Sequence, residues 1–437
     1  MIFKAILSIT FAVFILSGTI YADPETSDLL AVKAVSSGEN ESAEAIIKLR
    51  ERGPDGLTAL FATYSEEISE FRRNGTETEK WRKIAAAIDA VAMQKDAYAS
   101  ELYWYTDLNE AKKAARSSNK PILTLRLLGN LNEEFSCANS RLFRSLLYAN
   151  AEVSKYLREN YILHWKSVRP APRITIDFGD GRKIERTITG NSIHYVIDDD
   201  GRIIEAIPGL YSPKAFLIYL TQAKQVNDAI DGKDARQQEL ALMRYRKLSY
   251  DHLKNGRDAA IKELKIDLSN DNAAGVDVLP AYGAAPVATA KMMVTDEIGL
   301  LRFYDVFMQY ANRVDFGEWQ RLADRYSPAT SLDDETIAFV RRQTSKTRLT
   351  SVQFDRMFAK LRSFVGLDTT RNDFLYHTQL YSRLNMEAVE NGGKATDLEA
   401  FNSWVYAELF KTPDSDKWLG LYSTDVYTAL DGNGLTN

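Results

Sequence analysis

Apolar and polar residues alternate along this chain in ways that divide it into three segments. Between residues 23 and 100, apolar residues recur every three or four positions, as at 43–49 and 57–68, which predicts amphipathic helices. A Gly-Pro-Asp-Gly break at 53–56 separates the first two helices, and the pattern predicts a third from 78 to 98. The N-terminal region is therefore expected to be a small array of antiparallel helices.

The middle segment, residues 101–224, alternates helical stretches with short apolar runs. The run at 122–128 predicts a buried strand, and those at 193–197 and 202–206 predict two strands joined by the turn Asp198-Asp199-Asp200-Gly201. Residues 173–189 alternate around an Asp-Gly turn, which predicts a β-hairpin. These patterns predict an α/β domain, closed by a helix at 213–223.

Helical periodicity returns in the last segment, residues 225–437, for example at 298–307 and 354–364. Residues 270–286 are rich in Asn, Gly, Ala and Pro and are expected to form a loop. The aromatic residues of 404–421 are expected to pack back onto the body of the protein. We predict a large helical C-terminal domain.

The first 22 residues have the features of a secretory signal. A basic residue, Lys4, precedes an apolar run and small residues, and a cleavage site is expected near Ala22. The alternative is a buried N-terminal helix. The run is shorter than the about 20 residues that cross a bilayer, and no later segment is apolar enough to be a transmembrane helix. We expect a secreted or periplasmic protein without an integral membrane segment in the mature chain.

Composition narrows the function classes. The chain of 437 residues has a net charge of −5 and no basic tract, which argues against nucleic acid as the main partner. Its single cysteine, Cys137, cannot form an intramolecular disulfide, so an exported protein of this sequence must rely on packing. We find no nucleotide-binding or hydrolase motif.

Cys137 begins the sequence Cys137-Ala138-Asn139-Ser140, a C-x-x-S after the predicted strand at 122–128. The order of helix, strand, cysteine-bearing helix and later strands over residues 101–224 resembles the thioredoxin-like superfamily, whose members carry C-x-x-C at this place. The resemblance covers a little over a quarter of the chain. It implies a thioredoxin-like α/β central domain, with a hairpin inserted near 173–189, flanked by all-α N-terminal and C-terminal regions. Ser136 stands where the family usually has Trp, and Ser192 where it has a cis-proline.

Two hypotheses for Cys137 follow from its position at the start of a helix. Unpaired N–H groups and the helix dipole favour a thiolate there, with the Ser140 hydroxyl close to the sulfur, and such a thiol can exchange with a disulfide. Alternatively, Cys137 is a small buried residue in a domain that has lost its redox chemistry. A helical lid over Cys137 would make the thiol inert, so the packing of the helical regions decides between them.

Other polar residues have structural and functional interpretations. Arg126, inside an apolar run, could stabilise a thiolate or bind an anion, but an edge position or a buried ion pair is the commoner case. The four histidines lack the spacing of a metal motif, and we expect neither a metal nor a cofactor. The turn at 198–201 lacks the glutamate of a calcium loop. Residues 368–377 could line a groove, but helix caps and solvated faces are the commoner roles.

The leading prediction is an exported, thioredoxin-like, non-catalytic scaffold that binds a protein or a ligand through its thioredoxin-like face or its helical regions. The alternative is a monothiol disulfide exchanger or client trap that uses Cys137 as nucleophile and Ser140 as its neighbour. A third hypothesis is an enzyme with its site among the C-terminal helices, for which the sequence offers no constellation of residues.

Overall fold

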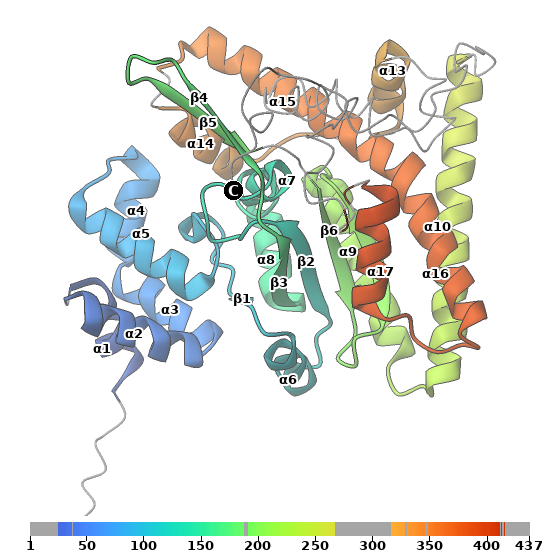
Figure 1. Ribbon diagram of the computed structural model, residues 1–437, viewed down its shortest axis with the longest axis horizontal. Helices are drawn as coiled ribbons and strands as arrows, with labels where there is room; N and C mark the ends of the chain where they lie inside the picture. The colour runs from blue at the N-terminus through green and yellow to red at the C-terminus, as the bar shows by residue number, and fades with distance from the viewer. Residues whose placement is uncertain are drawn as a thin grey trace, which may run out of the picture.

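The computed structural model describes residues 25–410, apart from residues 37, 188–190, 267–315, 328–329 and 346–347, and also residues 412 and 415. Over these residues the chain is a mixed α/β structure with a five-stranded sheet and many helices (Figure 1). The coarse prediction of an α/β middle segment between helical regions is therefore confirmed. The predictions for residues 1–22, 270–286, 298–307 and 418–421 lie outside the described residues.

The N-terminal region is helical, as its apolar spacing predicts. Its helices are α1 (Ser27–Ser36), α2 (Glu39–Glu51), α3 (Pro54–Thr63), α4 (Ser65–Asn74) and α5 (Glu79–Ala92). The single helix predicted at 78–98 is wrong in its extent. Met93 takes a left-handed conformation with φ 52°, which ends α5, and the 3₁₀ turn η1 (Ala97–Ala99) follows.

The central sheet has the strand order β1-β3-β2-β6-β7. Its strands are β1 (Trp104–Tyr105), β2 (Ile122–Leu128), β3 (Ile162–Arg169), β6 (Ser192–Ile197) and β7 (Ile203–Pro208). Strands β1 and β2 run parallel to β3, whereas β6 is antiparallel to β2 and β7 is antiparallel to β6. The buried strand predicted at 122–128 is confirmed. The turn at 198–201 is also confirmed, because the Asp198 carboxylate accepts three backbone N–H groups, of Asp200, Gly201 and Arg202.

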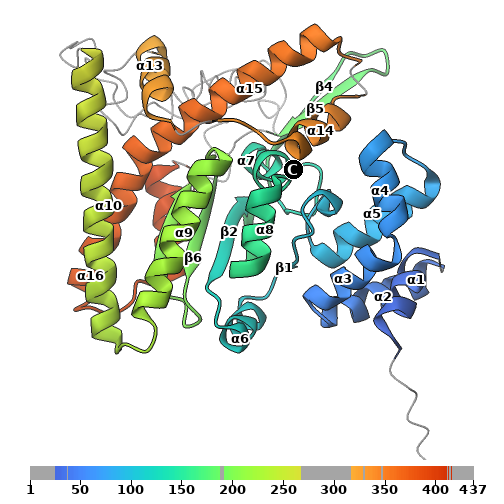
Figure 2. The same ribbon diagram turned by 180° about the vertical axis from the view of Figure 1, so that it is seen from behind.

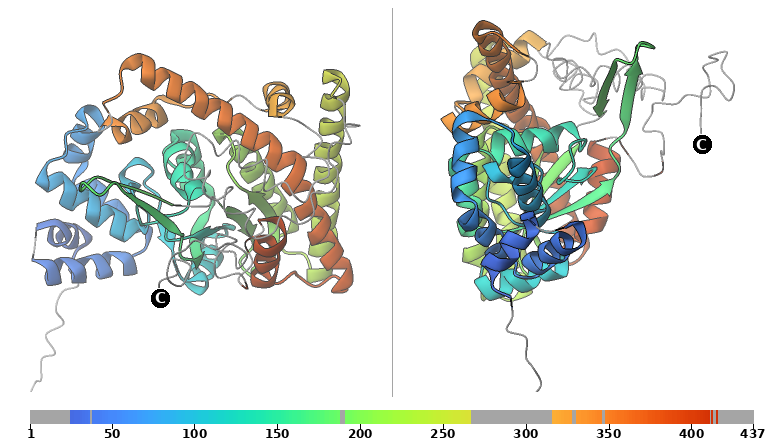
Figure 3. Two further views of the ribbon diagram at one scale, coloured as in Figure 1. Left: turned by 45° about the horizontal axis from the view of Figure 1, so that its top comes forward. Right: turned by 90° about the vertical axis from the view of Figure 1, so that its left-hand side faces the viewer.

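Helices cover both faces of this sheet. The helices of the middle segment are α6 (Leu108–Ser118), α7 (Ala138–Leu142), the π-helical segment η2 (Phe143–Leu147), α8 (Ala151–Asn160) and α9 (Pro213–Ile230). Figure 2 shows α8 and α9 across one face. The predicted hairpin is confirmed as β4 (Arg173–Asp177) and β5 (Lys183–Thr187), a separate two-stranded sheet that projects from the body (Figure 3).

The C-terminal region packs against the sheet and the N-terminal helices. Its elements are α10 (Ala235–Leu264), α13 (Phe316–Tyr326), α14 (Asp334–Gln343), α15 (Ser351–Arg371), η6 (Asn372–His377), α16 (Thr378–Glu390), α17 (Leu398–Trp404) and η7 (Val405–Leu409), where η6 and η7 are π-helical. Together α15, η6 and α16 form one rod that crosses from α4 and α5 to α10 (Figure 3). Within the described part of the chain, no helix combines the length and apolar character needed to cross a membrane.

The boundary predicted between residues 224 and 225 falls inside α9, which continues to Ile230. The apolar side of α9 and the C-terminal helices share one hydrophobic core with the sheet, which includes Phe216 of α9, Tyr195 of β6 and Phe401 of α17. The central α/β segment and the C-terminal helices are thus one folded unit at this seam.

Candidate functional site

Cys137 is the N-cap residue of α7, directly after the loop that follows β2. Its backbone N–H donates to Leu128 O at 3.0 Å, which ties this loop to the end of β2. The Ser140 N–H points at the Cys137 sulfur at 3.5 Å. The structure therefore brings Cys137 and Ser140 together at a helix N-terminus, as the sequence predicts.

Two hydroxyl groups and a carbonyl surround the sulfur. The Cys137 Sγ lies 3.3 Å from Ser140 Oγ, 2.9 Å from Ser192 Oγ and 3.8 Å from Asn191 O. Ser192 occupies the position at which the resemblance expects a cis-proline, and the described residues contain no cis peptide bond. A serine hydroxyl thus contacts the thiol from the strand that faces it.

The C-terminal region covers this thiol. Cys137 is fully buried, with 0% of its surface exposed. The Tyr406 hydroxyl of η7 donates to Asn191 O at 3.2 Å, and the Asn191 side chain reaches Phe410 O and Thr412 Oγ1 at 3.4 and 3.3 Å. A disulfide in another molecule cannot reach the sulfur in this arrangement, because thiol exchange requires contact between the sulfur atoms.

Arg126 lies on β2, inside the sheet, and is 1% exposed. Its guanidinium donates to Glu399 Oε1 of α17 at 2.8 Å, and Lys166 reaches the other oxygen of the same carboxylate at 3.0 Å. Burial by itself would raise the pKa of Glu399, but the two cations outweigh it, and the pKa is lowered. Of the two structural interpretations, the edge position is wrong, because β2 is an inner strand. Arg126 forms an ion pair instead, in which Arg126 is buried and Glu399 is 49% exposed, and this pair joins α17 to the sheet.

The histidines of the sheet are buried and uncharged. His164 pairs with the Thr124 hydroxyl at 2.7 Å, and His194 with the Tyr148 hydroxyl at 2.7 Å. Burial is the main reason that the pKa of each imidazole is lowered to about 3. No group of His, Cys, Asp and Glu side chains suited to a metal ion occurs among the described residues.

A second polar region lies where β7 meets the C-terminal rod. Glu205 of β7 is completely buried, yet its carboxylate accepts four hydrogen bonds. One oxygen accepts from His377 Nε2 at 2.9 Å and from the Ala206 N–H at 2.8 Å. The other accepts from the Tyr381 hydroxyl at 2.8 Å and from the Tyr245 hydroxyl. Burial by itself would raise the pKa of Glu205, but His377 and these donors lower it.

His377 continues this network to Asp373. Its Nδ1 lies 3.3 Å from the Tyr211 hydroxyl and 3.8 Å from Asp373 Oδ1, and the Tyr219 hydroxyl donates to Asp373 Oδ1 at 2.6 Å. Burial by itself would lower the pKa of His377, but Glu205 and Asp373 outweigh it and raise that pKa to about 9. His377 is therefore an imidazolium at neutral pH, between two carboxylates.

The π-helical segment η6 supplies both Asp373 and His377. A π-helical turn replaces the α-helical register locally, and such turns are frequent at functional sites. All six residues of η6 are buried. The prediction that residues 368–377 are caps and solvated faces is therefore wrong for this segment, because the rod turns these polar residues toward β7 and α9.

An open cleft of about 660 Å³ lies beside this network, between α9 and α10. The two helices meet at the short connection after Ile230 and diverge away from it (Figure 2). Side chains one turn apart on each helix form the walls. The lining residues are Ala215, Ile218, Tyr219, Gln222, Gln225, Val226 and Ala229 of α9, Tyr245, Leu248, Ser249, His252 and Leu253 of α10, Tyr326 of α13, Asp373 of η6 and Tyr381 of α16.

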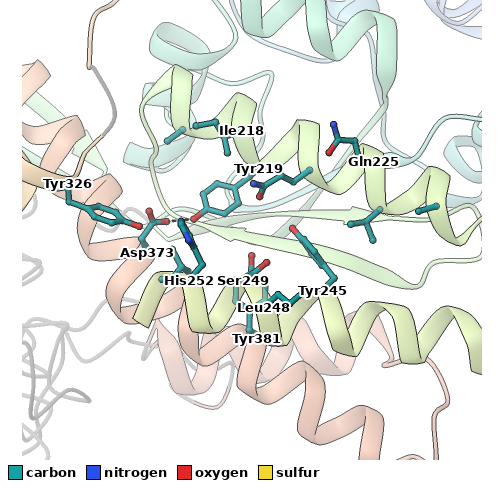
Figure 4. A pocket seen from close by; sticks show the side chains of 15 residues that line it. Ile218, Tyr219, Gln225, Tyr245, Leu248, Ser249, His252, Tyr326, Asp373 and Tyr381 are labelled. Atoms are coloured by element: carbon teal, nitrogen blue, oxygen red, sulfur yellow. Dashed lines mark hydrogen bonds between the residues drawn. The ribbon is translucent and has the colours of Figure 1, made fainter. Parts of the chain in front are cut away.

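Figure 4 shows how the polar side chains lie in the cleft. Asp373 stands between the rings of Tyr326 and Tyr219, and His252 and Ser249 lie opposite on α10. Tyr245 lies further along the same wall. The cleft thus combines apolar walls with a carboxylate at one end, an arrangement typical of sites that bind small molecules.

Sequence analysis did not identify Glu205 or the tyrosines that surround it. The available signal was a charged residue within the apolar run of β7, which is the same signal that singled out Arg126 in β2. Asp373 and His377 were noted as residues that could line a groove, and Asp373 does line the cleft.

Comparisons with known proteins give no assignment for either region. No family model, no curated protein and no solved structure matches this chain.

Proposed function

We propose that the protein is a non-catalytic ligand-binding protein on a redox-degenerate thioredoxin-like scaffold, with its binding site in the cleft between α9 and α10. The observation that carries this proposal is the cleft of about 660 Å³, with its apolar walls and the carboxylate of Asp373. The thiol, by contrast, is covered. The scaffold then serves to position α9, α10 and the C-terminal rod, whose side chains line the cleft.

The thioredoxin-like part of the proposal is supported by the order and direction of the strands. The sheet has three parallel strands, β1, β3 and β2, followed by the antiparallel strands β6 and β7. Cys137 lies where the resemblance predicts its redox motif, after the central strand and at the start of a helix. Ser140 in place of a second cysteine and Ser192 in place of a cis-proline support the loss of redox chemistry.

A monothiol exchanger or client trap is the alternative, and one observation favours it. The Ser140 N–H points at the Cys137 sulfur and the Ser140 hydroxyl lies 3.3 Å from it, so polar groups already surround the atom that would act as nucleophile. In that mechanism the thiolate attacks a disulfide of a client, one client sulfur leaves as a thiolate, and a mixed disulfide remains. Tyr406, Phe410 and Thr412, which bond to Asn191, must first move away from it.

Export is part of the proposal because the first 22 residues have the pattern of a secretory signal. The mature chain is then expected to begin after Ala22, in a secreted or periplasmic fraction. N-terminal sequencing of the protein purified from its native cells tests this, and an intact Met1 in that material contradicts it.

Binding of Nile red, an uncharged dye whose emission rises in apolar surroundings, tests the binding site. We expect saturable binding of one dye per chain. This binding should be lost in Ile218→Trp, because the bulkier indole ring would fill part of the cleft. The matched control is Leu240→Trp, on the exposed side of α10 and outside the cleft, where 57% of the leucine is exposed. Equal binding by the two variants, or no binding by the native protein, contradicts the proposal. Cys137→Ser should bind the dye normally.

A further inference from the structure

The polar network at the end of the cleft brings two carboxylates to one imidazole ring. Glu205 and Asp373 both face His377, at 2.9 and 3.8 Å. One imidazolium thus faces two carboxylates, and the other buried cation nearby, Arg246, pairs with Glu239 at 3.0 Å and acts on Glu205. Asp373 is the carboxylate of this pair that lines the cleft, whereas Glu205 lies behind it and is fully buried.

The rest of the cleft supplies no compensating cation. Among the described residues that line it, none is a lysine or an arginine. The other polar side chains there are amides, hydroxyls and the imidazole of His252. An anionic ligand would meet the Asp373 carboxylate with no fixed positive partner, whereas a cationic ligand would complement it.

Aromatic rings add to this preference. Tyr219, Tyr245, Tyr326 and Tyr381 all line the cleft, and the faces of such rings attract cations. Three of the rings are held in place by their hydroxyl groups, since Tyr219 donates to Asp373 and both Tyr245 and Tyr381 donate to Glu205. These three rings are therefore preorganised for binding.

The apolar walls are partly open to solvent. Ile218 is 42% exposed and Leu248 is 60% exposed, although both are large aliphatic side chains, and they line the cleft from α9 and α10. An apolar ligand body between these helices would remove both side chains from water.

We propose that the cleft binds an organic cation, with an ammonium group at Asp373 between Tyr219 and Tyr326 and an apolar body between Ile218 and Leu248. This inference rests on the proposed function and adds the chemical class of the ligand. The ammonium group is expected to donate hydrogen bonds to the Asp373 carboxylate oxygens and to lie against the ring faces of Tyr219 and Tyr326, while the apolar body replaces water along α9 and α10.

Three probes with one apolar body and different charges test the inference. Phenylbutylamine is a cation at neutral pH, phenylbutanol is neutral and phenylbutyrate is an anion. Isothermal titration calorimetry with the full chain should show that the amine binds at least about tenfold more tightly than the alcohol, because a carboxylate and ring faces stabilise the charge. Phenylbutyrate should bind more weakly than the alcohol.

Substitutions inside and outside the cleft test whether the preference for a cation arises there. Gln222→Lys puts a cation on the exposed wall of α9, one turn from Tyr219. It should lower the affinity for the amine about tenfold and raise the affinity for phenylbutyrate. Gln237→Lys adds the same charge at an exposed position on α10 outside the cleft, and should leave all three affinities unchanged. Asp373→Asn should lower the affinity for the amine alone, and circular dichroism checks that this variant is folded.

The outcomes separate the inference from the proposed function. If the amine and the alcohol bind equally, or if Gln222→Lys has no effect on the amine, the cation preference is overturned, whereas Nile red binding still supports a ligand site. If the cleft binds Nile red but none of the three probes, the inference is again overturned. If Nile red itself does not bind, the proposed function fails together with the inference.

Discussion

Charged residues inside buried strands mark the places where distant elements dock. Arg126 on β2 meets Glu399 of α17, and Glu205 on β7 meets His377 of η6. A buried charge without a partner is strongly destabilising, so each of these residues needs a partner of opposite charge. The sequence indicates that need, but the partners lie 273 and 172 residues further along the chain.

At the same scale, burial controls the reactivity of Cys137. Alkylation of the folded protein by iodoacetamide should be at least about a hundredfold slower than alkylation of the unfolded chain, because the thiol must be uncovered first. Tyr406→Ala, which removes the hydroxyl that bonds Asn191 O, should speed alkylation. Tyr64→Ala, in the separate N-terminal core, serves as the matched control. The measurement is the alkylation rate by mass spectrometry.

Fast alkylation of the native protein, with an apparent thiol pKa well below the usual value of about 8.5, would contradict this expectation and support the monothiol hypothesis. Equal rates in Tyr406→Ala and Tyr64→Ala would show that the C-terminal segment is not the cover.

At the scale of elements, the connection from β7 to α9 fits closely against the π-helical segment η6. Gly209 has φ +67°, a conformation that favours glycine, and a Cβ there would lie 2.7 Å from the Asn372 Nδ2 atom. That amide is buried and donates to Leu210 O at 2.8 Å. The position of Asp373, the next residue in η6, is thereby tied to the end of β7.

Gly209→Ala should lower the free energy of unfolding by about 2 to 4 kcal/mol, from backbone strain together with the contact on Asn372. Gly232→Ala is the matched control. Gly232 has φ +71°, but nothing lies within 4 Å of its Cβ position, so only the strain of about 1 kcal/mol applies. Urea denaturation measures both variants. Equal losses in the two would mean that the Gly209 contact with η6 contributes nothing to stability.

At the scale of the whole molecule, the C-terminal helices contact both other parts of the protein. It docks on β7 through Glu205 and His377, and the sheet and the C-terminal helices share one hydrophobic core. The N-terminal helices have their own core, which receives Phe339 of α14. The C-terminal region thus contacts the N-terminal helices and the far edge of the sheet, in addition to the direct hydrogen bonds that Trp104 and Trp165 donate to the N-terminal region.

Stability should fall as the pH rises through the pKa of His377. That pKa is raised from the ordinary value of 6.5 to about 9 in the folded protein, so the folded state holds the proton more tightly than the unfolded chain. The stabilisation is fully present below pH 6.5 and is lost by about pH 9. Between these values the free energy of unfolding should fall by up to about 3 kcal/mol.

Urea denaturation at both pH values measures this fall. His377→Gln should be less stable throughout, because Glu205 loses its charged partner, but it should lack this part of the pH dependence. His252→Gln, at an exposed histidine of the cleft, should show the same dependence of unfolding free energy on pH as the native protein. An unchanged slope in His377→Gln would mean that His377 is not the titrating group.

Local sequence determined the elements. The apolar run of β2, the Asp-Gly turn of the β4–β5 hairpin and the helical spacing of α2 and α3 were all predicted, because burial patterns and turn chemistry act over a few residues. The predicted extent of α5 and the predicted end of α9 were wrong. The left-handed conformation of Met93 and the packing of α9 on the C-terminal helices depend on contacts beyond the few residues that a sequence pattern covers.

Tertiary structure alone decided the site. The sequence placed Cys137 and Ser140 at a helix start, but only the fold brings Ser192 and Tyr406 around them and covers the thiol. Likewise, Asp373 becomes a carboxylate in a cleft only because β7, α9 and the C-terminal rod converge on it. Periodicity records which side of an element is buried, whereas the partner on that side depends on how distant elements pack, and this packing is not encoded in any short stretch of sequence.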